Sequence, residues 1–263
     1  MPITVTHLLK MKQDGEKIVA LTAYDASFAA LVDEAGVDVV LVGDSLGMVV
    51  QGHASTLPVS VEDIVYHSAA VARGLRSALL IADLPFMSYR DVPTAMANAA
   101  RLMAAGGANM VKLEGAGWTL DVIKALSERD IPVCAHLGLT PQSVHKLGGY
   151  RVQGRGAEQA DQLLQEARDV QRSGADLLVL ECVPAALAAE ISRHLAIPTI
   201  GIGAGVDCDG QILVLYDAMG ITPGKRPRFS KNFLVDTGSI SSALSSYVEA
   251  VRNGSFPAAE HSY

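Results

Sequence analysis

Cysteine is scarce in this sequence, and its spacing offers neither a disulfide framework nor a metal site. Only three cysteines occur among 263 residues, with no C-x-x-C pair. An odd, scattered set excludes a cysteine-ligated zinc site and is typical of reduced cytoplasmic thiols. A basic-then-apolar leader is also missing, as is any apolar run near the ~18 residues of a membrane span. We therefore expect a cytoplasmic protein without membrane contact.

Positive charge is in short supply as well. Lysine and arginine total 21 against 28 aspartates and glutamates, giving a net charge of -7. Nucleic acid binding needs a basic footprint, so nucleic acid is excluded as a partner. Charged residues make up 19% of the chain, below the roughly 25% of an average domain. This deficit predicts that part of the surface is buried against other subunits.

Familiar nucleotide and hydrolase motifs are missing too. The sequence contains no G-x-S-x-G elbow, Walker loop or H-E-x-x-H pair. The glycine-rich run that begins at Gly201 fails the G-x-G-x-x-G pattern, because Val206 stands where the last glycine belongs. A dinucleotide site is therefore excluded, and these glycines are expected to let the backbone approach a ligand.

The sequence does contain a repeated strand pattern. Residues 39–42 are four consecutive apolar residues, which is typical of a parallel strand buried on both faces. Eight such runs recur, most with helical patterns between them, and they cover residues 18–22, 39–42, 78–82, 109–113, 131–135, 176–180, 198–202 and 211–215. With helices also expected at 5–11 and 239–253, the pattern predicts a single-domain α/β protein, a (β/α)8 TIM barrel over residues 1–263. A doubly wound open sheet is the alternative.

Polar residues follow five of these runs. They are Asp44, Asp83, Glu114, His136 and Glu181. One aspartate after a strand is commonly only a turn or a helix cap. In a barrel, however, the carboxyl ends of all strands meet at one rim, where active sites are built. The repetition therefore predicts an acidic active site.

Four carboxylates in one small volume repel one another unless a cation offsets their charge. Oxygen ligands with open positions suit Mg²⁺. We assign Asp44, Asp83 and Glu114 as ligands, directly or through water, because they come from neighbouring strands. Glu181, left without metal, is the natural general base.

Two further side chains complete the predicted site. Lys112 lies two residues before Glu114 on the same strand face, where it could hold a substrate carboxylate or pair with a neighbouring acid. His136 could bind substrate or simply pack with a hydrogen bond. We keep both as substrate-binding candidates.

Long stretches resemble a known family. They include LTAYDASFA, LVGDSLGMVVQGHASTLPV, IADLPFMSY, NMVKLEG, AHLGLTPQSV, GGYRVQGR, LLVLECVP, IPTIGIGAG and DGQILVLYDAMGI. On these motifs the chain resembles the ketopantoate hydroxymethyltransferase family of the phosphoenolpyruvate/pyruvate barrel superfamily. The resemblance implies that Asp44, Asp83 and Glu114 bind magnesium. It also implies that Ser45, with Asp44, Asp83 and Lys112, contacts a 2-oxoacid, and that Glu181 accepts a proton.

The reaction implied by this resemblance starts from 3-methyl-2-oxobutanoate held on Mg²⁺. Its enolate attacks the methylene carbon of 5,10-methylenetetrahydrofolate as cosubstrate and yields 2-dehydropantoate for pantothenate and coenzyme A. The resemblance also implies a homo-oligomer, usually a decamer. The loop at 137–156, with Arg151 and Arg155, is a candidate folate surface.

Two other functions compete with this one. The chain could be another magnesium-enolate C–C lyase or mutase on the same barrel, although it lacks the K-K-C-G-H loop that marks the lyases. It could also be a catalytically dead barrel that serves in assembly, but such a protein is expected to have lost part of its acidic set.

Overall fold

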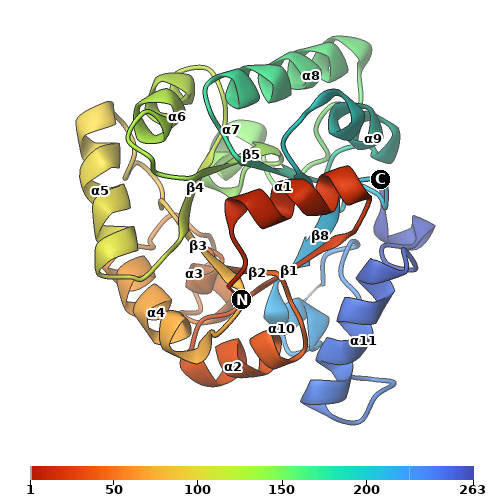
Figure 1. The fold of residues 1–263 in the computed structure, drawn as a ribbon. Helices are drawn as coiled ribbons and strands as arrows, with labels where there is room; N and C mark the ends of the chain where they lie inside the picture. The colour runs from red at the N-terminus through yellow and green to blue at the C-terminus, as the bar shows by residue number, and fades with distance from the viewer. Residues whose placement is uncertain (1, 225) are drawn as a thin grey trace.

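The protein forms a closed barrel of eight parallel strands in sequence order, as the pattern predicts (Figure 1). The structure is a computed structural model that describes residues 2–224 and 226–263. The strands are β1 (Ile18–Thr22), β2 (Val39–Val42), β3 (Leu79–Asp83), β4 (Met110–Glu114), β5 (Val133–Gly138), β6 (Leu177–Glu181), β7 (Thr199–Ile202) and β8 (Gly210–Leu213). β8 pairs with β1 and closes the barrel, which rules out the open sheet.

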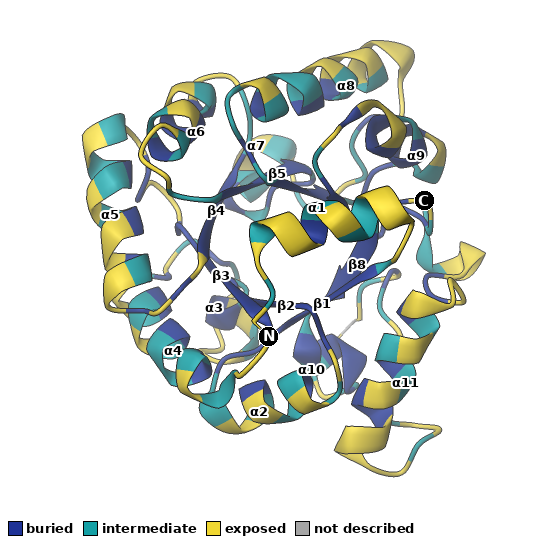
Figure 2. Ribbon diagram, in the orientation of Figure 1, coloured by how far each residue is buried: buried dark blue, intermediate teal, exposed yellow. Residues whose placement is uncertain are grey.

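Helices surround the strands and bury their outer faces. They are α1 (Val5–Asp14), α2 (Ala26–Glu34), α3 (Leu46–Val49), α4 (Val61–Gly74), α5 (Val92–Ala104), α6 (Thr119–Ser127), α7 (Val144–Leu147), α8 (Ala157–Arg172), α9 (Ala185–His194), α10 (Leu215–Ala218) and α11 (Ile240–Arg252), with 3₁₀ turns η1 (Pro141–Ser143) and η2 (Ala259–His261). Figure 2 shows the strands largely buried and the helices exposed on their outer sides; the last residues of β5 and β6, Gly138 and Glu181, are partly exposed.

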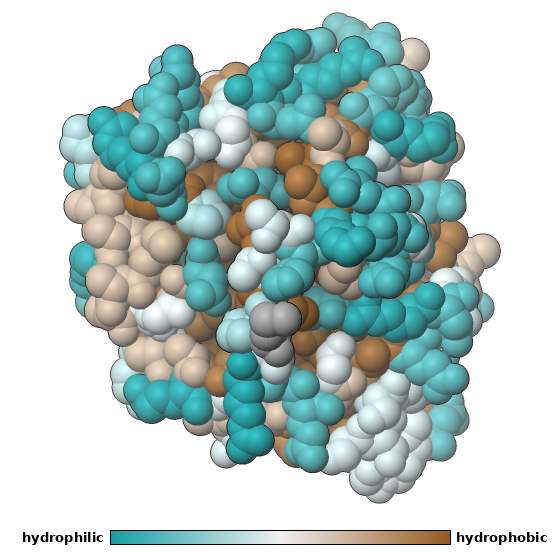
Figure 3. Space-filling view, viewed as in Figure 1, coloured by the Kyte–Doolittle hydropathy of each residue, from teal (hydrophilic) through white to brown (hydrophobic). Residues whose placement is uncertain are grey.

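Helix α1 lies across the barrel end at which the strands begin (Figure 1). Leu8 anchors it in the core, and the Lys12 Nζ atom donates to Asp209 Oδ2 at 2.7 Å. This face of the molecule is largely hydrophilic, whereas weakly hydrophobic residues reach the surface over α5 (Figure 3). Helix α1 therefore covers this end of the barrel and leaves the opposite end, where the strands finish, to the loops that follow the strands.

Side chains fasten the strands together in pairs where they begin. The residue immediately before each even-numbered strand accepts a hydrogen bond from a backbone N–H of the preceding odd-numbered strand. The donor and acceptor pairs are Val19 to Asp38, Leu80 to Asn109, Val133 to Asp176 and Thr199 to Asp209, at 2.8 to 2.9 Å. The four bonds join β1 to β2, β3 to β4, β5 to β6 and β7 to β8.

Several strands end later than the apolar runs predict. Asp83, Glu114 and Glu181 are the last residues of β3, β4 and β6 rather than the first residues after them. Their backbones stay in the ladder, with Glu114 opposite His136 and Glu181 opposite Gly138. Opposite charges lie near these side chains: Lys112 Nζ donates to Asp83, and His136 lies within 3.4 Å of both Glu114 and Glu181.

The stretches predicted to be irregular contain short helices. Leu46–Val49 forms α3, and the loop after β5 contains η1 and α7. Helices of three or four residues have too little periodicity to be recognised in the sequence. Among residues 2–224 and 226–263, no helix is long and apolar enough to cross a membrane.

Candidate active site

The predicted acidic residues come together at the carboxyl ends of β2, β3 and β4. The backbone N–H of Asp44 donates to Asp83 Oδ2 at 2.9 Å, and Lys112 Nζ donates to Asp83 Oδ1 at 2.5 Å. Gly43 makes this approach possible, because a Cβ there would lie 3.2 Å from Asp83 Oδ2 and 3.0 Å from Ser45 Oγ. Ser45 itself shares a hydrogen bond of 2.8 Å with the Tyr24 hydroxyl.

Burial makes these charges strongly interdependent. Asp44, Asp83, Lys112 and Glu114 are each at most 5% exposed. Burial raises the pKa of Asp44 well above its ordinary value, and the charges of Asp83 and Glu114 raise it further. Burial opposes the charge on Lys112, but the three carboxylates, Asp83 first, outweigh it and raise the lysine pKa. The buried ammonium thus stays charged and partly offsets the acids.

His136 lies between two of the predicted acids. Its Nδ1 atom is 3.4 Å from Glu114 Oε1, and its Nε2 atom is 3.3 Å from Glu181 Oε2. Burial and Lys112 act to lower the pKa of His136, but the two glutamates outweigh them and raise it to about 9. The imidazole therefore connects the predicted metal ligand Glu114 to the predicted base. The Glu181 side chain keeps 15% exposure, against 3% for Glu114.

The backbone around Glu181 is shaped by two unusual conformations. Gly138, opposite Glu181, has φ +90°, and a Cβ there would collide with the Glu181 carbonyl oxygen. Cys182 has φ 49°, a strained conformation for a non-glycine residue and one that recurs at functional sites. Burial raises the pKa of the Cys182 thiol above its ordinary value, which argues against a nucleophilic role.

Sequence reasoning missed two residues of the site. Gln142, in η1, donates from its backbone N–H to Glu114 Oε2 and from its side chain to Asp44 Oδ2, both at 2.9 Å. The Tyr89 hydroxyl donates to Gln142 Oε1 at 2.6 Å. Both residues lie in loops without periodicity, and their chemistry is uncharged. The unusual length of the loop after β5 was a signal for Gln142, and both residues stand in stretches that carry the family resemblance, IADLPFMSY and AHLGLTPQSV, but neither was assigned a role.

The donor set suits a hard divalent cation, although its side chains do not converge on one point. Asp44, Asp83 and Glu114 supply only oxygen atoms, the ligand type that Mg²⁺ prefers. Glu114 Oε1 is buried without a hydrogen-bond partner. Within the described part of the chain, however, no three His, Cys, Asp or Glu side chains are arranged to hold a metal ion. The residues fit the cation by chemistry and burial.

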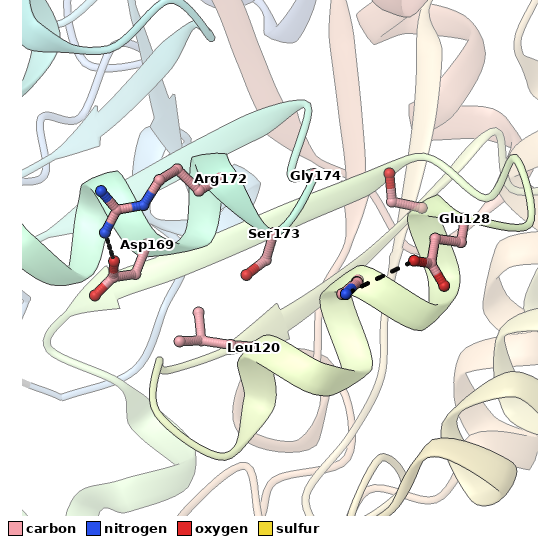
Figure 4. A pocket seen from close by; sticks show the side chains of 8 residues that line it. Leu120, Glu128, Asp169, Arg172, Ser173 and Gly174 are labelled. Atoms are coloured by element: carbon pink, nitrogen blue, oxygen red, sulfur yellow. Dashed lines mark hydrogen bonds and ion pairs between the residues drawn. The ribbon is translucent and has the colours of Figure 1, made fainter.

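A surface cleft between α6 and α8 is a separate feature (Figure 4). It lies near Ser127 and Gly174, where these helices end before β5 and β6, and so at the opposite end from the acidic site. Its charged side chains pair along their own helices, Arg172 with Asp169 and Lys124 with Glu128. Nothing in this cleft points to chemistry.

The fold and site define a (β/α)8-barrel enzyme whose acidic centre lies at the carboxyl ends of its strands. The ketopantoate hydroxymethyltransferase family model matches residues 2–259. The chain belongs to that family and is a hydroxymethyl-transferring enzyme. A relative from Shewanella loihica, named 3-methyl-2-oxobutanoate hydroxymethyltransferase, is 62% identical over 99% of this chain and 98% of its own length. One from Alkalilimnicola ehrlichii with the same name is 61% identical over 100% and 95%.

Solved structures with much lower sequence identity have the same fold. A phosphonopyruvate hydrolase in complex with oxalate and Mg²⁺ superposes with a TM-score of 0.62 at 15% identity, covering 83% of both chains. A 2,3-dimethylmalate lyase of the PEP mutase/isocitrate lyase superfamily gives 0.61 at 18% identity, covering 84% of this chain and 83% of its own. These likenesses confirm the predicted TIM-barrel fold.

Proposed function

We propose that the enzyme transfers a one-carbon unit from 5,10-methylenetetrahydrofolate to 3-methyl-2-oxobutanoate, with Mg²⁺ bound by Asp44, Asp83 and Glu114. One water supplies the hydroxyl oxygen, and the products are 2-dehydropantoate and tetrahydrofolate. The observation that carries the proposal is the buried acidic centre of a chain whose relatives, at about 60% identity, bear the name of this activity. The product leads toward pantothenate, as the relatives' name implies.

When bound, Mg²⁺ would supply Lewis acidity to the 2-oxo group and offset the charge of the carboxylates. A magnesium complex is named for the phosphonopyruvate hydrolase that shares this fold, which supports the choice of metal. The positive charge that the protein itself supplies in the acidic centre is the Lys112 ammonium, which lies 2.5 Å from Asp83. It is placed to hold the carboxylate of the 2-oxoacid, with Ser45 as a further contact.

Glu181 would remove the proton from C3 of the substrate. Of the two glutamates that contact His136, Glu181 has the more exposed side chain, so its carboxylate can face a bound molecule. His136 Nε2 lies 3.3 Å from Glu181 Oε2, and the positive charge of its imidazole would keep that carboxylate in the ionised form that can accept a proton. The resulting enolate carbon then forms a bond to the methylene carbon of the folate as one of its two C–N bonds breaks. The water oxygen bonds to the same carbon as the second C–N bond breaks, and the two folate nitrogens take up the C3 proton and one water proton.

Hydrogen exchange at C3 tests this function without folate. The enzyme is incubated with 3-methyl-2-oxobutanoate in D₂O, with and without Mg²⁺, and the C3 proton is followed by NMR. We expect magnesium-dependent exchange that disappears in Glu181→Gln, while substrate binding persists. Glu158→Gln, at an exposed glutamate on α8, is the matched control. Equal loss of binding and exchange in Glu181→Gln would argue against the general-base role.

Folate dependence and assembly need separate measurements. Product formation with and without 5,10-methylenetetrahydrofolate distinguishes this transferase from another magnesium-enolate lyase or mutase. Magnesium binding by calorimetry in the presence of the 2-oxoacid distinguishes an active enzyme from a dead scaffold. The decamer stays a prediction that light scattering can test, and the cytoplasmic location stays a prediction as well.

A further inference from the structure

Gln142 donates hydrogen bonds to two carboxylates of the acidic centre, although no role was predicted for it. It is 6% exposed and lies in the short turn directly after β5. Its backbone N–H binds Glu114 and its side chain binds Asp44, which come from β4 and β2. These strands are not neighbours, because β3 lies between them. Gln142 therefore bridges two acids that the sheet itself does not join.

The orientation of the Gln142 amide is fixed by its surroundings. Its nitrogen lies 3.1 Å from the carbonyl oxygen of Leu84, which can only accept, so the nitrogen must face that atom. The amide oxygen is then left to accept from the Tyr89 hydroxyl. Burial raises the pKa of Tyr89, which keeps its hydroxyl protonated and able to donate.

Tyr89 is itself held by packing. It is 4% exposed, and its ring stacks on that of Trp118 with centroids 5.6 Å apart and planes 13° from parallel. A reversed amide would place its oxygen against Asp44 and Leu84 and its NH₂ against the Tyr89 hydroxyl. The oxygen atoms of Leu84 and Asp44 thus select one orientation of Gln142, and the stacked tyrosine supports it by donating to the amide oxygen.

We infer that Gln142 is a positioning residue that holds the carboxylates of Asp44 and Glu114 in place for the metal, and that the Tyr89 hydroxyl steadies its amide through the hydrogen bond to the amide oxygen. The inference rests on the proposed function. Groups that orient metal ligands commonly change metal affinity or activity by about 10- to 100-fold when removed. Gln142 has the contacts of such a group while touching neither the predicted base nor Lys112.

Three variants test the two parts of the inference. Gln142→Leu removes the side-chain amide that binds Asp44, at similar volume, and keeps the backbone N–H that binds Glu114; we expect C3 exchange and Mg²⁺ affinity to fall by about 10- to 100-fold. Tyr89→Phe removes one hydroxyl and keeps the ring, so we expect a smaller loss of about 2- to 12-fold, the value of one neutral hydrogen bond. Gln142→Glu places a carboxylate against Asp44 and should be more damaging than Gln142→Leu.

Mg²⁺ affinity is measured by calorimetry with the 2-oxoacid present, and folding is checked by circular dichroism. Gln162→Leu and Tyr66→Phe, at exposed positions, are the matched controls. A merely structural role would lower the melting temperature and leave the affinity and exchange rate per folded molecule unchanged. That result in Gln142→Leu would overturn the inference.

Two further outcomes remain decisive. If Gln142→Leu does not fold, Tyr89→Phe with wild-type affinity and exchange would still overturn the relay from Tyr89 to the site. A wild-type enzyme that neither binds Mg²⁺ nor exchanges C3 would refute the proposed function and this inference together. A wild type that does both, beside a Gln142→Leu variant that does both equally well, would refute the inference alone.

Discussion

Replacing Lys112 by methionine should destabilise the enzyme strongly in the absence of metal. The change keeps most of the side-chain volume but removes a buried ammonium that lies 2.5 Å from Asp83. Removing one partner of a buried ion pair typically costs about 3–5 kcal/mol, because the other charge is left buried and unpaired. That is a large share of the roughly 5–15 kcal/mol that stabilises an average domain.

Thermal unfolding in EDTA gives the direct measurement. For a chain of this size each kcal/mol corresponds to about 2–4 °C, so the melting temperature should fall by about 6–20 °C. The double variant Lys112→Met/Asp83→Asn should regain part of the loss, because it also removes a buried negative charge. Asparagine can still accept from the backbone of Asp44, so the local hydrogen bond is kept.

The pH dependence of the loss follows from Asp44. The pKa of this carboxyl is already raised by burial and by its acidic neighbours, and Lys112 acts against the shift. Without the lysine the pKa rises further. A raised carboxyl pKa gives stability that is present below the ordinary value and is lost as pH rises through the folded value. The penalty of Lys112→Met should therefore be larger at pH 8 than at pH 5.

Two results would refute this reasoning. The first is a Lys112→Met variant within about 1 kcal/mol of the wild type, which is the range of an exposed pair. The second is a double variant no more stable than the single one. Either would mean that the acids are not held together by the lysine charge.

Other predictions concern the scaffold. Ser60→Ala removes the hydroxyl that caps α4 and should cost about 1 kcal/mol in urea unfolding. Burial raises the pKa of Asp176, so Asp176→Asn should gain stability relative to the wild type at pH 7 but not at pH 3.5, below the ordinary value of 3.8. A gain equal at both pH values would contradict this. All three cysteine thiols are buried with raised pKa values, so a thiol reagent at pH 8 should react with them only after unfolding.

The sequence predicted the barrel because its strands are short apolar runs that standard burial rules recognise. The predicted bounds of β1 and β2 agree with the structure. Prediction was less accurate for β3, β4, β5 and β6, where charged or polar residues inside the strands, His136 of β5 among them, looked like the residues after them. Their buried partners become visible only once the strands are side by side.

The charged residues of the candidate site could be predicted from the sequence. Asp44, Asp83 and Lys112 do come together, and His136 does contact both Glu114 and Glu181. Gln142 and Tyr89 were not assigned a role, because neutral residues in aperiodic loops give no chemical signal before the fold brings them beside a carboxylate. The predicted roles of Ser45 and of the folate loop stay predictions.

The four hydrogen bonds that join the strands in pairs where they begin also allow the opening of the barrel to be followed. In each pair, one odd-strand amide donates to a side chain instead of a backbone carbonyl, at Val19, Leu80, Val133 and Thr199. Amide hydrogen exchange at these four positions then reports on four separate β-strand pairs. If one of these amides loses its protection while the other three stay protected, the strand pair to which it belongs opens separately from the other three pairs, as an independent cooperative unit.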